Sequence, residues 1–202
     1  MTWLDARSTV ADLPGGQFRL RPVDPEADVE LVHAWMNDPE VARFWELGVP
    51  AGRIAAYLCE QIGSAHSTPY IGELDGAPMS YWELYRADLD PLARHYPARR
   101  GDAGVHLLLG STGFRGRGLG TRLLATVAGW QLAADPAATR VVAEPDVHNE
   151  RSIRAFERAG FRRVTDIDLP DKRAALMVRP GPSARPSSRG HSRMDRITEE
   201  AR

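Results

Sequence analysis

The stretch FRGRGLGTRLL, from Phe114 to Leu124, has glycines at 116, 118 and 120, arginines at 115 and 117, and then an apolar run with helical spacing. Glycines let backbone N–H groups approach a ligand closely, and a helix N-terminus carries partial positive charge. The stretch therefore suits phosphate groups at the start of a helix. An ordinary glycine-rich turn between a strand and a helix is the alternative.

Two common phosphate-binding motifs do not match this loop. A P-loop requires Lys followed by Ser or Thr where Leu119 and Gly120 stand. The dinucleotide-binding fingerprint requires a glycine where Thr121 stands, early in a βαβ array. The class of this loop therefore has to be inferred from the order of the strands and helices around it.

Outward from the loop, the hydrophobic periodicity predicts strands and helices in a mixed order. A strand at 103–110 precedes the loop and a helix at 121–135 follows it. The remaining predicted elements are a strand at 18–23, helices at 25–36, 37–45 and 53–62, a hairpin of strands 69–74 and 78–85, a long loop at 87–102, a strand at 140–147, a helix at 150–160 and a strand pair within 161–178.

Composition favours one soluble domain that binds small molecules. The chain has 202 residues, 43% of them hydrophobic, and a net charge of −1, which argues against nucleic-acid and membrane partners. Cys59 is the only cysteine, and the six histidines show no metal-ligand spacing, so we expect no metal. We expect a cytoplasmic protein, and a monomer is favoured over an oligomer. Residues 1–17 are expected to be loosely ordered, one domain to cover 18–180, and a disordered tail to cover 181–202.

The strand AGVHLLL, the pattern Arg115-x-x-Gly118-x-Gly120 and a later helix that follows an asparagine and ends in Ala159-Gly160-Phe161 resemble the GNAT superfamily of acyl-CoA-dependent N-acyltransferases. The resemblance covers about residues 18 to 180. It implies an α/β (α+β) fold, in which helices flank a mixed, mostly antiparallel central sheet whose fourth and fifth strands splay apart.

The same resemblance implies a site for acetyl-CoA or another acyl-CoA as co-substrate. The pyrophosphate would meet backbone N–H groups of the glycine loop, at Arg115, Gly116, Arg117, Gly118, Leu119, Gly120 and Thr121. The pantetheine arm would pair with the strand edge and contact the start of the later helix, at Leu107, Leu108, Leu109, Asn149, Ser152 and Phe156. Plain helix capping and core packing are the alternatives for the last three. Many family members have tyrosine where Phe156 stands, which leaves the general acid unassigned.

Three stretches, 33–45, 80–110 and 143–156, resemble the siderophore-biosynthesis acyltransferases that modify the side-chain nitrogen of lysine or N6-hydroxylysine. The aminoglycoside 6'-N-acetyltransferases are the nearest alternative, and they share a PDxxAxxM-like ending, here PDKRAALM. The segment ARHYPARRGD, 93–102, is basic and suits an acceptor with a carboxylate, whereas a polycationic antibiotic predicts a deep acidic pocket. A non-catalytic acyl-CoA-binding module is the third possibility.

Within that branch, the resemblance implies that His106, Glu144 and Asp146 are catalytic. A single histidine in an apolar strand is more often a core residue. A lysine amine, with a pKa near 10.4, must however lose a proton before it attacks a thioester directly, and histidine, near 6.5, suits that role. Glu144 would orient the imidazole or attract the ammonium ion. Residues expected to line the acceptor pocket are Trp82, Glu83, Tyr85, His33 and Trp35, with His95 and Tyr96 from the long loop.

Overall fold

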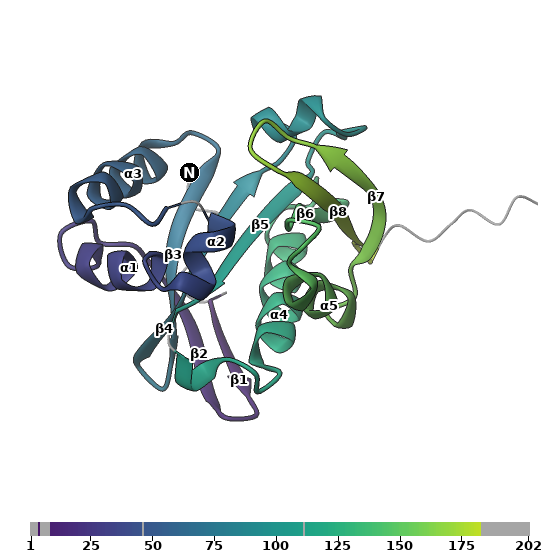
Figure 1. Ribbon diagram of the computed structural model, residues 1–202. Helices are drawn as coiled ribbons and strands as arrows, with labels where there is room; N and C mark the ends of the chain where they lie inside the picture. The colour runs from purple at the N-terminus through teal and green to yellow at the C-terminus, as the bar shows by residue number, and fades with distance from the viewer. Residues whose placement is uncertain (1–3, 5–8, 46, 111, 183–202) are drawn as a thin grey trace, which may run out of the picture.

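The computed structural model describes residue 4 and residues 9–45, 47–110 and 112–182. One sheet has the strand order β1-β2-β3-β4-β5-β6-β8-β7 (Figure 1). Its strands are β1 (Val10–Leu13), β2 (Gly16–Pro22), β3 (Ser67–Leu74), β4 (Ala77–Arg86), β5 (Ala103–Leu109), β6 (Arg140–Ala143), β7 (Arg162–Asp168) and β8 (Arg173–Pro180). The α-helices are α1 (Val29–Met36), α2 (Pro39–Trp45), α3 (Ala51–Gly63), α4 (Leu119–Ala134) and α5 (Glu150–Arg158).

The neighbouring strands β5 and β6 separate soon after they meet. They form the sheet's one parallel pairing among the described residues, through Ala103 with Val141 and Gly104 with Val142 only. The rest of β5 pairs with β4 on its other side. This confirms the expected fold class, a mixed and mostly antiparallel sheet with splayed central strands.

Alternating side chains of the central strands pack into cores on the two faces of the sheet. Tyr81 and Leu108 join the core built with α1, α2 and α3. Trp82 and Val105 join the opposite core, built with α4 and α5. Figure 1 shows α1 to α3 beside β3 and β4, and α5 beside β7 and β8. The open edge of β5 thus lies between two helical layers, which gives a ligand walls on both sides.

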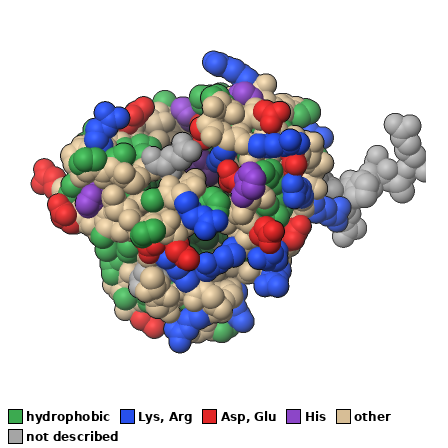
Figure 2. All heavy atoms as spheres, in the orientation of Figure 1, with side chains coloured by type: hydrophobic (Ala, Val, Ile, Leu, Met, Phe, Trp, Pro, Cys, Tyr) green, Lys and Arg blue, Asp and Glu red, His purple; other side chains and the backbone are tan. Residues whose placement is uncertain are grey.

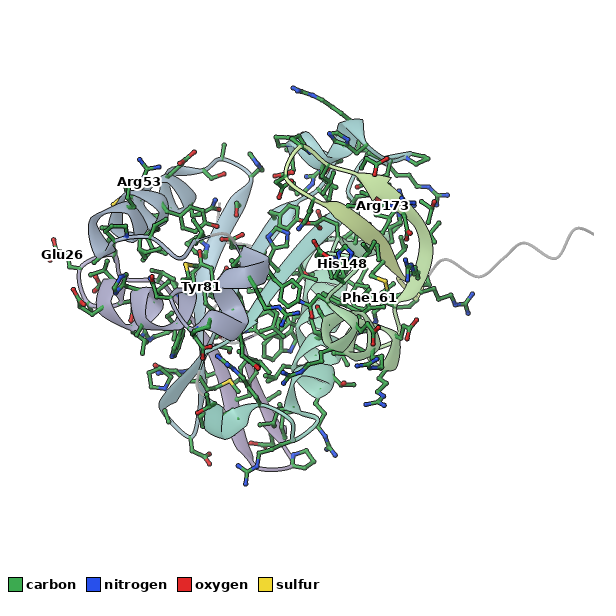
Figure 3. The ribbon with its side chains drawn as sticks, viewed as in Figure 1. Glu26, Arg53, Tyr81, His148, Phe161 and Arg173 are labelled. Atoms are coloured by element: carbon green, nitrogen blue, oxygen red, sulfur yellow. The ribbon has the colours of Figure 1, made fainter. Side chains whose placement is uncertain are left out.

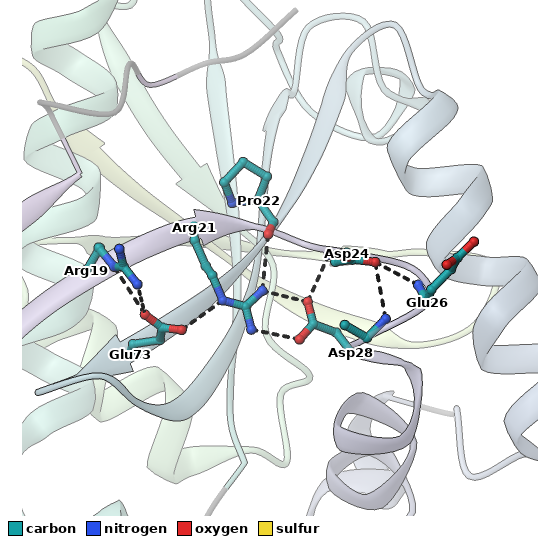
Figure 4. Close-up of polar contacts among 8 residues, drawn as sticks. Arg19, Arg21, Pro22, Asp24, Glu26, Asp28 and Glu73 are labelled. Atoms are coloured by element: carbon teal, nitrogen blue, oxygen red, sulfur yellow. Dashed lines mark hydrogen bonds and ion pairs between the residues drawn. The ribbon is translucent and has the colours of Figure 1, made fainter.

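A buried ion cluster fixes the start of α1 (Figure 4). Arg21 on β2 donates to both carboxylate oxygens of Asp28, at 2.7 Å each, and to Glu73 at 2.8 Å. The Asp24 side chain accepts from the N–H of Glu26 at 2.9 Å. These contacts hold 24–28 as a turn, and α1 therefore begins at Val29 and not at residue 25.

Two segments differ from expectation. The strand β1 lies within 1–17, where loose order was expected, and pairs with β2. Residues 1–3 and 5–8 and the predicted tail from 183 lie outside the described residues. The long loop 87–102 contains a 3-10 turn, η1 (Pro91–Arg94), and packs on its own cluster around the fully buried Asp102.

Candidate active site

Two adjoining cavities open along β5 where β6 departs from it. The first, which we name the loop cavity, measures about 520 Å³ and reaches from β5 to the glycine loop and α5. The second, the acidic cavity, measures about 300 Å³ and lies at the His106 end of β5. Both are lined by Phe44, Trp45, Leu107, Asn149, Ser152 and Phe156. These shared residues make one continuous site with two parts.

The backbone that lines the loop cavity has a conformation typical of anion-binding sites. Gly116 and Gly118 have φ of +76° and +74°, a conformation that other residues adopt at a cost, and a Cβ at either would meet no atom within 4 Å. Gly118 is the N-cap of α4, and no side chain caps this helix start. The first N–H groups of a long helix therefore point toward open space beside glycines.

Arginines surround the opening of the loop cavity. Figure 2 shows Lys and Arg side chains gathered around a hollow near the middle of the visible face. The lining includes Arg43, Arg151, Arg154 and Arg158, with Glu40 and Glu150 as acidic members. A ligand with several phosphates matches this surplus of positive charge.

The Arg115 side chain has a structural task. Its guanidinium donates to the carbonyl oxygens of Leu109 at 3.0 Å and Gly110 at 2.7 Å. It also forms an ion pair with Asp38 at 2.8 Å, and this hydrogen bond lowers the pKa of that carboxyl. Arg115 thus ties the glycine loop to the end of β5 and to α2, and leaves phosphate contacts to the loop's backbone.

In the acidic cavity, His106 lies between two carboxylates from different strands. Its Nδ1 is 2.9 Å from Oε2 of Glu83 on β4, which faces His106 across the β4–β5 pairing. Its Nε2 is in hydrogen-bond contact with Oε1 of Glu144, the residue after β6. Both carboxylates are buried, at 5% and 6% exposure, whereas the imidazole is 34% exposed to the cavity.

Tyrosine hydroxyls hold both carboxylates in place. Tyr57 on α3 donates to Oε1 of Glu83, and Tyr81 donates to the same oxygen at 2.9 Å. Tyr85 donates to Oε2 of Glu144 at 3.0 Å and lies 3.2 Å from Nε2 of His106. Burial and the nearby carboxylates raise the pKa of all three hydroxyls, which therefore stay protonated and act as donors. Figure 3 shows Tyr81 in the part of the sheet next to α2.

This geometry makes the resting imidazole a cation. An ionised carboxylate only accepts hydrogen bonds, and a neutral imidazole has one N–H, so two carboxylate partners require both nitrogens to carry protons. Burial alone would lower the pKa of His106, but the charges and hydrogen bonds of Glu144 and Glu83 raise it to about 10. Burial alone would raise the pKa of Glu144, yet the His106 cation lowers it to about 2.

This protonation state corrects one expectation. We expected a histidine with an ordinary pKa near 6.5, ready to accept a proton at neutral pH. In the resting site His106 already holds that proton. It becomes a base only where the pH approaches its raised pKa, or where a cation competes for its carboxylates.

The structure brings most predicted site residues together and leaves others apart. Asp146 lines the acidic cavity beside Glu144, and its carboxylate accepts from the N–H of His148 at 2.7 Å. Asn149 caps α5 by accepting from the N–H of Ser152 at 3.1 Å, while it also lines both cavities. Capping and ligand contact therefore do not exclude each other here.

Six residues expected in the acceptor pocket line neither cavity, although one of them, Tyr85, reaches the site through its hydroxyl. Strand parity turns Trp82 into the core beneath α4, the opposite face from Glu83. Trp35 packs against Gly110, and His33 lies elsewhere on α1. His95 and Tyr96 belong to the loop 87–102.

The basic segment 93–102 also lines neither cavity. Its Tyr96 and Asp102 form a cluster with Arg140, whose guanidinium is 2.7 Å from each oxygen of the Asp102 carboxylate. The cavity contains Glu83, Glu144, Asp146 and Asp171. The charge of segment 93–102 therefore does not distinguish a carboxylate-bearing acceptor from a polycationic one, as we had expected it to.

Among the residues of this site that the sequence analysis did not name are Tyr57 and Lys172, which line the acidic cavity, and Tyr81, which donates to Glu83. No motif marks the two tyrosines. Lys172, in the turn between β7 and β8, has its Nζ 3.9 Å from Oε1 of Glu144. The sequence does distinguish Lys172, because it is the only lysine in the chain.

Within the described ranges, no three or more His, Cys, Asp or Glu side chains are placed so that they could hold a metal ion. Among those same residues, none of the helices has the length and apolar character needed to cross a membrane.

Comparison with known proteins gives a consistent result. Residues 24–169 match the family model described as acetyltransferase (GNAT) domain. The chain is 37% identical over 163 residues to the lysine N-acyltransferase MbtK of Mycobacterium sp. (strain MCS), covering 81% of this chain and 67% of the relative. It is 38% identical over 158 residues to the N(6)-hydroxylysine O-acetyltransferase of Escherichia coli, covering 78% of this chain and half of that protein. The solved structure of the aminoglycoside acetyltransferase AAC(6')-Ib with coenzyme A superposes with a TM-score of 0.70 at 27% identity, covering 81% and 94% of the two chains.

Proposed function

Because the chain belongs to the GNAT acetyltransferase family and uses acyl-CoA as co-substrate, we propose that it acylates the side-chain nitrogen of lysine or N6-hydroxylysine in siderophore biosynthesis. The observation that carries this proposal is the His106 cluster, in which a proton-carrying side chain sits between two buried carboxylates. The cluster adjoins the loop cavity at Leu107. An acyl donor and an amine acceptor can therefore meet at β5.

The loop cavity suits the acyl-CoA. The open glycines at 116 and 118 and the uncapped start of α4 would receive the pyrophosphate. The unpaired side of β5 beyond Gly104 offers backbone groups to the amides of the pantetheine arm, in the manner of an added strand. Backbone N–H groups at Leu107 or Leu108 would polarise the thioester carbonyl.

The acidic cavity suits an acceptor that arrives as a cation. Glu83, Glu144 and protonated His106 together carry a net charge of −1, which attracts an ammonium group. When that ammonium contacts Glu144, it weakens the support that this carboxylate gives to the imidazolium, and His106 becomes easier to deprotonate. After His106 has released its proton to solvent, the neutral imidazole takes one proton from the bound ammonium. The free amine attacks the thioester carbon, the C–S bond breaks, and coenzyme A leaves as a thiolate that takes up the second proton of the amine nitrogen through water. No acyl-enzyme is formed.

Acylation of an aminoglycoside is the second candidate, because the acidic cavity also suits a polycationic sugar. The solved relative with coenzyme A is named an aminoglycoside acetyltransferase. A non-catalytic acyl-CoA-binding module is disfavoured by the cluster itself, since binding the coenzyme alone does not need a buried histidine between two glutamates.

One assay separates these functions. Thiol release is followed with acetyl-CoA and longer acyl-CoAs against lysine, N6-hydroxylysine, related diamines and kanamycin. Turnover with lysine or N6-hydroxylysine supports the proposal. Turnover confined to kanamycin refutes it, and coenzyme binding without turnover on any acceptor favours the non-catalytic module.

A further inference from the structure

We propose that Lys172 binds the carboxylate of an amino-acid acceptor and thereby selects lysine-type substrates over diamines that lack a carboxylate. This inference rests on the proposed function and names the group that would set its specificity. The acidic cavity has an imbalance of charge. Among the described residues that line the acidic cavity, His106 and Lys172 are the cations, and Glu83, Glu144, Asp146 and Asp171 are the acids.

The two cations are not equivalent. Both ring nitrogens of His106 already face carboxylates, so the imidazolium has no N–H left for an acceptor. The Lys172 ammonium has three donors, and its separation of 3.9 Å from Glu144 exceeds hydrogen-bond distance. It therefore has donors to offer an anion that enters the cavity.

The fold does not depend on the charge of Lys172. The turn between β7 and β8 is closed by a backbone bond, from the N–H of Leu169 to the carbonyl oxygen of Lys172, at 2.8 Å. The side chain is 22% exposed and extends toward Glu144, which is 6% exposed. Lys172 is also the only lysine among the 26 lysines and arginines of the chain. A compact ammonium with rotatable donors fits a small cavity better than a planar guanidinium.

Binding of the carboxylate would couple to the chemistry. A carboxylate that draws the Lys172 ammonium away from Glu144 leaves this glutamate free for the acceptor's own ammonium. In the complex, the acceptor carboxylate pairs with Lys172 and the acceptor ammonium pairs with Glu144, so each of these charges has a partner. A diamine can place an ammonium beside Glu144 but has no carboxylate to draw Lys172 away, so it gains only part of this binding.

The test compares acceptors that differ only in that carboxylate: L-lysine with 1,5-diaminopentane, and N6-hydroxylysine with N-hydroxy-1,5-diaminopentane. The quantity is the ratio of kcat/KM within each pair, from which any general loss of activity cancels. We expect the wild type to prefer the amino acid, and Lys172→Met to lower the ratio about 10- to 100-fold, the range for a charged hydrogen bond. Lys172→Arg, which keeps the cation, should retain part of the preference.

Arg173→Met is the matched control. It removes a positive charge from the adjacent residue on β8 (Figure 3), whose side chain is 64% exposed and lines neither cavity. Its ratio should equal that of the wild type. An unchanged ratio in Lys172→Met, or a wild type that does not prefer the amino acids, overturns the inference and leaves the proposed function standing. Absence of thiol release with all four acceptors overturns both.

Discussion

Replacing Glu83 with glutamine tests the account of His106 most directly. The substitution keeps the shape of the side chain, so it can still meet Tyr57, Tyr81 and His106, and it removes one of the two negative charges that hold the imidazolium. A carboxylate in hydrogen-bond contact typically shifts a partner's pKa by about 1–3 units. The pKa of His106 should therefore fall from about 10 by roughly 1–2 units.

The consequence for activity has a definite sign. If neutral imidazole is the active form, about 1 in 100 wild-type molecules holds it at pH 8 when the pKa is about 10. A fall of about 1.5 units would raise that fraction to about 1 in 4. The acid limb of kcat/KM against pH should move to lower pH in Glu83→Gln, even if the maximal rate is reduced by poorer positioning.

N6-hydroxylysine is the acceptor of choice for this assay, because its reacting nitrogen is far less basic than a lysine amine and adds no limb of its own near pH 10. The enzyme-free rate of thioester hydrolysis is subtracted at each pH. Titration of ¹⁵N-labelled histidine by NMR measures the His106 pKa independently of turnover. Glu26→Gln is the control, since Glu26 is exposed at the far edge of the molecule (Figure 3). A limb and an NMR pKa that both stay in place in Glu83→Gln would refute the bracketed imidazolium.

Three further changes have expected outcomes. Gly118→Asp should weaken coenzyme A binding at least about 10-fold in calorimetry, because it puts a negative charge where phosphate is expected, while Gly118→Asn, which tolerates the positive φ, should weaken it less. Arg140→Ala should lower the free energy of unfolding in urea by about 3–5 kcal/mol, because it leaves the buried carboxylate of Asp102 without its cationic partner; a loss below about 1 kcal/mol would contradict that account. A chain that ends at Pro182 should keep its melting temperature and turnover, because residues 183–202 are rich in Ser and Arg and contain few apolar residues; loss of either would show that the tail docks.

The sequence predicted what depends on local pattern. The glycine loop, the order of strands and helices and the hairpin turn at Asp75 and Gly76, both with positive φ, follow from periodicity and turn chemistry. The pairing of Glu83 with His106 required the register between β4 and β5, which no local pattern contains.

The site residues that were wrongly predicted or missed also depend on contacts between distant parts of the chain. A period of two says that Trp82 and Glu83 face opposite ways, but it does not say which of them faces the ligand. Tyr57 reaches the cluster from α3, a helix that its own sequence describes only as amphipathic. Segment 93–102 was assigned to the acceptor by its charge, whereas its buried Asp102 is neutralised by Arg140 within the same cluster. Long-range contacts decided each case.

The short pairing between β5 and β6 leaves one edge of β5 open beyond Gly104. At the closed end of the gap, two residue pairs join β5 and β6, and Arg140 on β6 binds Asp102, the residue before β5. Contacts of His106 and Tyr85 with Glu144 add to this connection between the two halves of the sheet. A molecule that pairs with the free edge of β5 and also contacts α5 acts as a removable strand that bridges them. The free energy of unfolding then depends on the concentration of that molecule, and it rises by about 2.7 kcal/mol when the molecule is present at 100 times its Kd. In a cell, the protein would be most durable when its acyl donor is plentiful and most exposed to proteolysis when the donor runs short.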